Sequence, residues 1–408
     1  MARRESFVKR RKAMGFSQES LAEAIGVERT TVSRWETGET APQSFHRPDL
    51  CRELKVSVSQ LDSLIHCVVG GPQAVPATTT QSASPLPAHD DEMEALELVR
   101  RVAASDVGGE TLSRLELVFD ELARQYPSSA PQDLLVRVRK YSAYVSHLLD
   151  ARKTLAEHRQ LLVLGGWFSL LGATLHIDLN QEHAATARLH TAMTLAKHAG
   201  HAEIQAWCFE TDAWRVLTAG DYAKAVELSK AAQALAPKGS SVEIQATAQE
   251  GRAYARLGQV NETYGAIGRV NALVSPMRFP DHPEHHYQYD PGKSVSYTAT
   301  TLAWVGDPAA EEYAREVINR LAPSNDISTW PRRVASANID LALSLVVSDR
   351  VDEACDAAQR AILSGRVVPS NRWRALEVVR AVESRKISEA SDLREAYEGM
   401  RQPAIESR

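Results

Sequence analysis

Residues 67–91 divide the 408-residue chain into two parts. The stretch reads CVVGGPQAVPATTTQSASPLPAHDD and contains four prolines but hardly any bulky apolar side chain. A segment of this composition cannot bury a core and behaves as a flexible linker. The sequence therefore predicts a small N-terminal domain over residues 1–66, a linker over 67–91 and a larger domain over 92–408.

The larger domain has a helical pattern throughout. Apolar residues recur at three- and four-residue spacing, and Gly, Asp or Pro separate the runs. The clearest unit is residues 206–237, in which small residues would let two antiparallel helices approach closely around a turn. Its small, turn-forming and helix-ending residues are Ala213, Gly220, Asp221, Ala225, Ala232 and Pro237.

This unit resembles the tetratricopeptide repeat family. Weaker copies place turns at residues 180, 258, 306 and 349, and Pro323 is expected to end one of the helices. The resemblance implies an α-solenoid of helix pairs in which the first helix of each pair lines the inner surface. The whole chain is accordingly predicted to be all-α.

The segment SQESLAEAIGVERTTVSRWETG, residues 17–38, predicts two short helices joined by a tight turn. Ser17 is expected to cap the first helix with only half of a capping box, since Ser20 stands where Glu or Gln is usual. Gly26 can adopt the positive φ that a sharp turn requires. The second helix is expected over about residues 28–37, with a polar face suited to a DNA major groove.

Residues 10–42 resemble the Cro/C1-type (XRE) helix-turn-helix family. The resemblance is carried by Arg11, Gly15, Ser17, Gln18, Leu21, Ala22, Gly26, Val27, Val32, Ser33, Trp35, Glu36, Gly38 and Pro42. It implies a small five-helix DNA-binding domain in which Arg11 and Glu36 form a partly buried ion pair. Pro48 suggests that the fourth helix starts late, with the proline at its first position.

The resemblance also implies which side chains meet DNA. Arginine can bond guanine bidentately and threonine can contact a thymine methyl group, whereas basic residues near the N-terminus can meet phosphates. The predicted DNA-binding residues are Gln18, Arg29, Thr30, Thr31, Ser33, Arg34, Lys9 and Lys12, with Arg3, Arg4 and Arg10 as further phosphate contacts. The charge distribution agrees with a DNA-binding N-terminal domain. Residues 1–65 carry 11 Lys and Arg against 9 Asp and Glu, whereas the whole chain has a net charge of −5.

A ligand-binding groove is predicted on the inner face of the solenoid. Trp207, Glu210 and Trp214 lie at i, i+3 and i+7 and so share one helix face. Transfer of this register to neighbouring repeats adds Trp167, Arg252, Arg256, Lys293 and Trp304. Tryptophans beside a basic strip are suited to a peptide with a carboxylate, and the alternative is that these tryptophans belong to the core.

Residues 281–290, DHPEHHYQYD, form a histidine-rich loop. A transition metal is one interpretation, but the flanking prolines and the lack of i, i+4 spacing favour a polar lid or docking loop. No nucleophile elbow, phosphate-binding loop or zinc-protease motif occurs, so we expect no enzyme, cofactor or metal. The scattered cysteines favour a reducing compartment over a disulfide framework.

Together these features predict a cytoplasmic, homodimeric transcriptional regulator. Its DNA-binding domain would recognise an operator, and its repeat domain would sense a peptide, small molecule or protein partner. The alternative is a protein scaffold that recruits or sequesters another regulator, with the DNA-binding domain only localising it. No membrane partner is expected, because the uncharged run over residues 161–175 is shorter than the ~20 residues that a membrane span requires.

Overall fold

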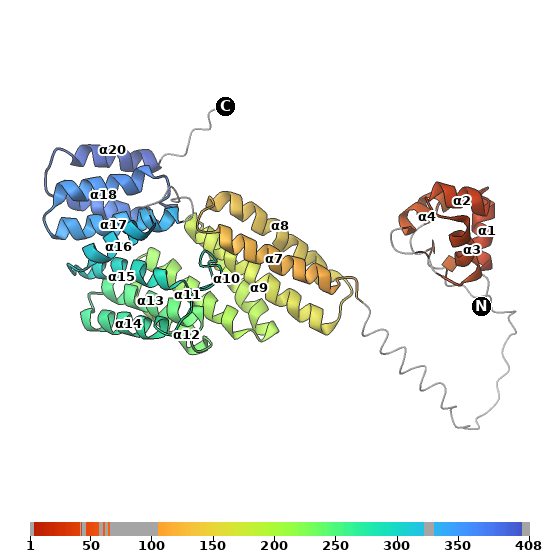
Figure 1. Ribbon diagram of the computed structural model, residues 1–408, viewed down its shortest axis with the longest axis horizontal. Coiled ribbons are helices and arrows are strands. Elements are labelled where there is room, and N and C mark those ends of the chain that lie inside the picture. The colour runs from red at the N-terminus through yellow and green to blue at the C-terminus, as the bar shows by residue number, and fades with distance from the viewer. Residues whose placement is uncertain are drawn as a thin grey trace, which may run out of the picture. The chain divides into compact units, whose positions relative to one another are not determined.

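The computed structural model describes residues 4–40, 42, 46–56, 60–61, 64–65, 105–321 and 330–401. Contacts divide the chain into two compact units, Met1–Leu86 and Pro87–Arg408, and each is described by itself. Every regular element among the described residues is a helix, so the all-α prediction is confirmed (Figure 1). The linker predicted over 67–91 lies outside the described residues.

Short helices surrounding one small core form the N-terminal unit. They are α1 (Glu5–Ala13), α2 (Gln18–Ala24), α3 (Arg29–Thr37) and α4 (Arg47–Leu54). The core between them contains Phe7, Leu21, Ile25, Val32, Trp35, Leu50, Leu54 and Leu61. The predicted fifth helix falls on residues that are described only in part.

Two helix starts in this unit differ from the sequence prediction. The N–H of Ser20 donates to Ser17 Oγ at 3.0 Å, and the N–H of Ser17 donates to Ser20 Oγ at 2.8 Å. The capping box is therefore complete, and the prediction of half a box was wrong because a serine hydroxyl can also accept this bond. Helix α4 begins at Arg47, which puts Pro48 at its second position.

Successive antiparallel helix pairs build the C-terminal unit (Figure 1). The first helices of the pairs are α7 (Gly109–Gln125), α9 (Leu155–Asp178), α11 (Ala202–Thr218), α13 (Ser241–Arg256), α15 (Pro291–Val305), α17 (Pro331–Val347) and α19 (Arg372–Glu383). The second helices are α8 (Pro131–Asp150), α10 (Glu182–Ala199), α12 (Tyr222–Leu235), α14 (Val260–Val274), α16 (Ala310–Leu321), α18 (Val351–Leu363) and α20 (Ala390–Arg401). A 3₁₀ turn, η1 (Pro369–Asn371), precedes α19. From α9 to α19, each first helix packs on the first helix of the next pair, as a solenoid requires.

The turns that the sequence places between paired helices are confirmed. The residue at each one has a left-handed backbone: Asn180 (φ 57°), Gly220 (91°), Gly258 (71°), Gly306 (77°) and Asp349 (60°). Such a residue ends a helix and lets the chain reverse. The helix pairs are thus observed, whereas the tetratricopeptide label itself stays a prediction.

Close approach of paired helices depends on small residues, as predicted. Ala213, Ala225 and Ala232 have no exposed surface. A Cβ added to Gly251 on α13 would lie 3.0 Å from the Cβ of Ala266 on α14, closer than most Cβ contacts, so glycine lets the two helices approach here without a shift. Helix α12 ends two residues before Pro237, and the stop predicted at Pro323 lies outside the described residues.

Helix α9 forms the centre of the first half of this unit. Among the described residues it is the one helix that is long and apolar enough to span a membrane by length and composition. Of its most apolar window, 83% is buried against neighbouring helices. Burial on all sides is how a core helix of a large domain behaves, so its apolar character has a structural cause.

The histidine-rich loop over 281–290 is fastened to the helices. The N–H of His286 donates to Ala123 O near the end of α7 at 3.0 Å. Tyr287 is 4% exposed, and its ring centroid lies 5.1 Å from that of Trp207. We call residues 281–290 the strap, because the loop is fastened to α7 and its tyrosine Tyr287 packs in the core. The strap also covers one side of a cavity that is described below, as the predicted lid would.

Candidate DNA-binding surface and ligand cavity

Helix α3 has one exposed polar face and one buried face. Arg29, Thr30 and Arg34 are exposed, and Thr31 and Ser33 are partly exposed. Val32, Trp35 and Glu36 point into the domain and are at most 2% exposed. The side chains predicted to reach base edges thus lie on the accessible face of the helix.

A buried carboxylate joins the first three helices. Glu36 on α3 accepts a hydrogen bond from Arg11 Nε on α1 at 2.6 Å and another from Gln18 Nε2 on α2 at 2.5 Å. Arg11 and Glu36 are 5% and 1% exposed. The ion pair that the family resemblance implied is therefore confirmed, and it also fixes the side chain of Gln18.

Beside this ion pair, Lys12, Gln18 and Arg29 line an open depression on the surface. Lys12 and Arg29 are exposed there, and Lys9 is exposed elsewhere on α1. Two cations and an amide around one depression are suited to a phosphate group of the DNA backbone.

Arg4 and Arg10 serve the fold of the domain instead of lying free on its surface. Arg4 Nη1 donates to Trp35 O at 2.8 Å and to Thr40 O at 2.6 Å, which satisfies carbonyls at the end of α3. Arg10 bonds in the same way to Leu54 O and Lys55 O at the end of α4. Capping of helix C-termini is a common role for arginine, and the phosphate contacts predicted for these two residues and for Lys9 and Lys12 stay predictions. Arg3 lies outside the described residues.

The arginines of the exposed face are held only weakly. Arg29 Nε lies 3.3 Å from Glu19 Oε1, and Arg34 Nε lies 3.8 Å from Glu39 Oε1. All four side chains are more than half exposed. Exposed pairs contribute about 0–1 kcal/mol, so DNA can displace these carboxylates at little cost.

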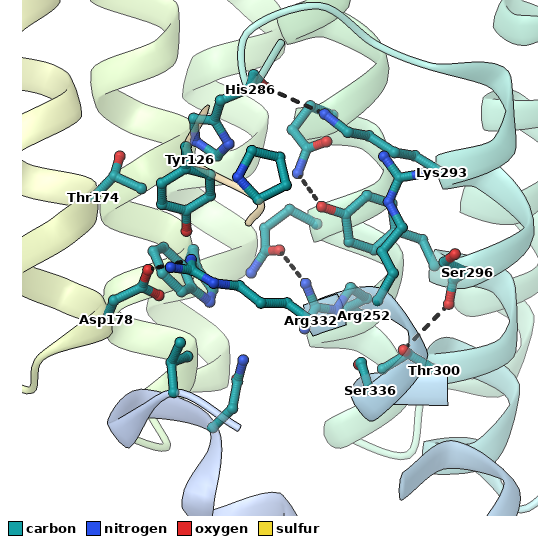
Figure 2. A pocket seen from close by; sticks show the side chains of 18 of the residues that line it. Tyr126, Thr174, Asp178, Arg252, His286, Lys293, Ser296, Thr300, Arg332 and Ser336 are labelled. Carbon is teal, nitrogen blue, oxygen red and sulfur yellow. Dashed lines mark hydrogen bonds and ion pairs between the residues drawn. The ribbon is translucent and has the colours of Figure 1, made fainter. Parts of the chain in front are cut away.

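The inner face of the helical unit forms a cavity of about 220 Å³ that is partly open to solvent. Its walls come from α9, α11, α13, α15, α17 and α19, and Glu284 and His286 of the strap cover one side (Figure 2). Charged groups from all six helices line it, among them Asp178, Glu210, Arg252, Lys293, Asp340 and Arg374.

Part of the predicted ligand groove coincides with this cavity. Trp207, Glu210, Trp214, Arg252 and Lys293 line it. Trp207 is also 2% exposed and packs in the core, so the ligand-site and core interpretations both apply to this residue.

Three predicted groove residues, Trp167, Arg256 and Trp304, are not among those that line the cavity. Trp167 packs on Phe119, with ring centroids 5.5 Å apart. Arg256 pairs with Glu377 at 2.8 Å, and its guanidinium lies over Trp304. A register copied from one repeat to the next ignores the rotation between successive helix pairs, so these three residues lie beside the cavity lining, and their ligand role stays a prediction.

Sequence reasoning missed the acidic and basic residues that α9 and α17 place in the cavity. Arg332 Nη1 lies 2.8 Å from Asp178 Oδ2, and Arg374 forms an ion pair with Asp340. Asp340 interrupts the apolar run of α17, IDLALSLVV, and a lone carboxylate in such a run is a signal that could have been used.

The end of the helical unit closes back on its beginning around the cavity. Arg332 Nη2 donates to Ser129 O at 2.7 Å, and its guanidinium lies 4.7 Å from the centroid of the Tyr126 ring. Asn180 Nδ2 donates to Pro369 O at 3.2 Å. These contacts join segments about 190 to 200 positions apart in sequence and make the inner face a concave space.

Burial changes the acid–base behaviour of two groups in the cavity. It raises the pKa of Glu210 to about 7, opposed by a hydrogen bond from Gln245 and by the charge of Arg252. Burial, followed by repulsion from Arg333, lowers the pKa of Lys293 to about 7. In the part of the chain that the structure describes, no three His, Cys, Asp or Glu side chains are grouped so as to hold a metal ion.

The model of the helix-turn-helix family matches residues 8–61. The matched residues include most of α1 and all of α2, α3 and α4. They therefore include the buried ion pair of Arg11 and Glu36 and the exposed face of α3. The N-terminal unit is therefore an XRE-type helix-turn-helix DNA-binding domain, and the chain is a DNA-binding regulator. A search of curated proteins finds no match to the chain.

Proposed function

We propose that the chain is a sequence-specific transcriptional regulator whose helical unit senses an effector in its cavity. The DNA-binding part rests on one observation, the exposed face of α3 with Arg29, Thr30 and Arg34. This face is supported from below by the buried pair of Arg11 and Glu36, so its orientation is fixed before DNA arrives.

The cavity supports sensing over scaffolding. The polar and charged residues here converge on one concave space between helices, which is the usual form of a small-molecule site. Unpaired polar groups are costly to bury, and a bound ligand would complete their bonds. The proposal places the chain in the cytoplasm, with DNA as its partner and without a catalytic role.

The test starts from DNA fragments selected by the purified full chain. Arg29→Ala should weaken binding to the selected sequence by about 1–3 kcal/mol and relax the preference at one base position. Lys12→Ala, the matched control, should weaken binding to all sequences and reduce the salt dependence by about one unit. Equal losses on selected and random DNA for Arg29→Ala would contradict base readout.

The same selected DNA tests the proposed homodimer. One helix-turn-helix domain covers a half-site, and dimers contact two half-sites about one helical turn apart. A footprint with two such half-sites, together with a dimer mass in sedimentation, would support the proposal. A single half-site bound by a monomer would contradict it.

A further inference from the structure

Most basic residues around the cavity have a carboxylate partner. Arg332 pairs with Asp178 at 2.8 Å, and Arg374 pairs with Asp340. Arg333 pairs with Asp290 at 2.7 Å. In each of these pairs the charge of the arginine is balanced by the charge of its carboxylate partner.

Arg252 has no such partner. It is 8% exposed, and Nη1 donates only to the neutral Gln249 at 3.1 Å. Its Nε is buried without a hydrogen-bond partner, and no carboxylate oxygen of the described chain lies within 4 Å of the guanidinium. Both oxygens of the nearby Asp340 are occupied, one by Arg374 and the other by the hydroxyl of Thr300 at 2.7 Å.

Lys293 is the second basic residue of the cavity without a carboxylate partner in the described chain. Its Nζ donates to His286 O and Gln288 O, both at 3.2 Å and both neutral, and Figure 2 shows the side chain extending towards His286. Tyr297 lies one turn further along α15, and the guanidinium of Arg252 rests on its ring at 5.3 Å. Arg252 and Lys293 therefore both line the cavity, Arg252 beside Tyr297 and Lys293 beside the strap.

Glu210 does not neutralise these two basic residues. Its hydrogen bond comes from Gln245 Nε2 at 3.2 Å, and no cationic nitrogen of the described chain lies within 4 Å of it. A buried carboxyl group that is partly protonated at neutral pH can instead donate a hydrogen bond to a ligand. The cavity thus combines one unpaired cation, Arg252, with two groups that titrate near neutral pH, Lys293 and Glu210.

The volume limits the size of the ligand. A cavity of 150 Å³ accommodates benzene, so about 220 Å³ suits a molecule of roughly ten non-hydrogen atoms. Trp207, Trp214 and Tyr297 add aromatic walls beside the cations.

We propose that this cavity binds a small organic anion, with its carboxylate or phosphate group held by Arg252 and its apolar part against the aromatic walls, while Lys293 adds positive charge to the cavity when it is protonated. The inference rests on the proposed sensing function and names the ligand class. It selects a small molecule from the three effector classes that the sequence left open.

The test uses the full chain with probes matched in size and different in charge. Benzoate and phenyl phosphate are the anions, benzamide is the neutral control and benzamidine is the cationic control. In isothermal titration calorimetry at up to 10 mM probe, we expect at least one anion to bind and benzamidine not to bind. Failure of both anions, or tighter binding of benzamidine, would overturn the inference.

Two variants locate the site. Arg252→Gln should weaken binding of the anion at least about tenfold, since it removes the charged partner. Lys293→Gln should weaken it by a smaller factor, since it removes positive charge from the same cavity. Lys293 is half-buried, so its variant stays informative if Arg252→Gln fails to fold. Arg256→Gln, one turn along the same helix and outside the cavity, is the matched control. Unchanged affinity in both cavity variants would overturn the assignment.

DNA binding separates this inference from the function on which it rests. An anion that binds at Arg252 and Lys293 without changing affinity for the selected DNA would leave the site in place and contradict sensing. If no probe binds while Arg29→Ala still loses sequence preference, the anion site is wrong and the DNA-binding regulator stands.

Discussion

The two units use charge in opposite ways. In the DNA-binding domain the arginines that face outward are more than half exposed and only loosely paired. In the helical unit, Arg252 and Glu210 are at most 8% exposed and line the cavity. A polyanion supplies many phosphates to an open surface, whereas a small ligand offers few contacts and is bound tightly only where water is excluded.

The difference has an energetic side. Exposed ion pairs contribute little, so the DNA-binding face can exchange carboxylates for phosphates without loss of stability. Buried charges carry a desolvation cost that only a partner offsets. The comparison therefore predicts large effects where a buried pair is broken and small effects on exposed faces.

The largest effect should come from Glu36→Ala. This change leaves Arg11 buried without its partner and frees Gln18, so the DNA-binding domain should lose about 3–5 kcal/mol of unfolding free energy. Calorimetry of the full chain should show a lower transition for this domain and an unchanged one for the helical unit. Glu19→Ala, which removes only the exposed partner of Arg29, should stay within about 0.5 kcal/mol of the parent. A similar loss in both variants would remove the distinction between buried and exposed pairs.

An intermediate effect is expected from Glu210→Gln in the cavity. The pKa of Glu210 is about 7 in the folded protein, above its ordinary value of 4.5, so the cost of its charge is absent below about pH 4.5 and complete above about pH 7. The variant should therefore be more stable than the parent by roughly 1–3 kcal/mol at pH 8 and equal to it near pH 4.5.

Urea unfolding of the helical unit at the two pH values measures this difference. Glu203→Gln, on the same helix and outside the cavity, is the matched control. A gain for Glu210→Gln that is the same at both pH values would show that the charge of this carboxyl group is not the cause.

The smallest effects test the turns of the solenoid. Gly220 has a φ of 91°, so Gly220→Ala should lower the free energy of unfolding by about 1–2 kcal/mol through backbone strain. A steric clash does not contribute, because no atom lies within 4 Å of the added Cβ. Gly268, in the exposed interior of α14, also has open space around it, and Gly268→Ala should stabilise by about 0.5–1 kcal/mol. Opposite signs in thermal unfolding are expected, and a gain at both positions would contradict the role of positive φ.

Much of this architecture was accessible from the sequence because it depends on local interactions. Positive φ at Asn180, Gly220 and Asp349 follows from residue types that tolerate it, and the helix pairs follow from apolar periodicity between such turns. The DNA-binding face is contiguous in sequence, so a single motif specifies both α3 and its orientation. The capping prediction at Ser17 was wrong only in its second half, since Ser20 accepts the bond from the N–H of Ser17 that Glu or Gln usually accepts.

The cavity is different, because distant segments decide it. Helical spacing placed Trp207, Glu210 and Trp214 on one face, but whether Arg252 or Arg256 joins them depends on the rotation between helix pairs. That rotation results from packing summed over the whole solenoid and is encoded at no single position.

The sequence by itself determined which segments are helices, where they turn and which face of α3 is polar, since these depend on backbone preferences and near neighbours. Only the tertiary structure decided which charges are left unpaired. Burial lowers the pKa of Arg252, and the negative charge of Asp340 acts on Arg252 against this shift. The hydrogen bonds of Asp340, however, are made with Arg374 and Thr300. The arrangement of α13, α15, α17 and α19 places Arg374 and Thr300, and not Arg252, within hydrogen-bond distance of this carboxylate.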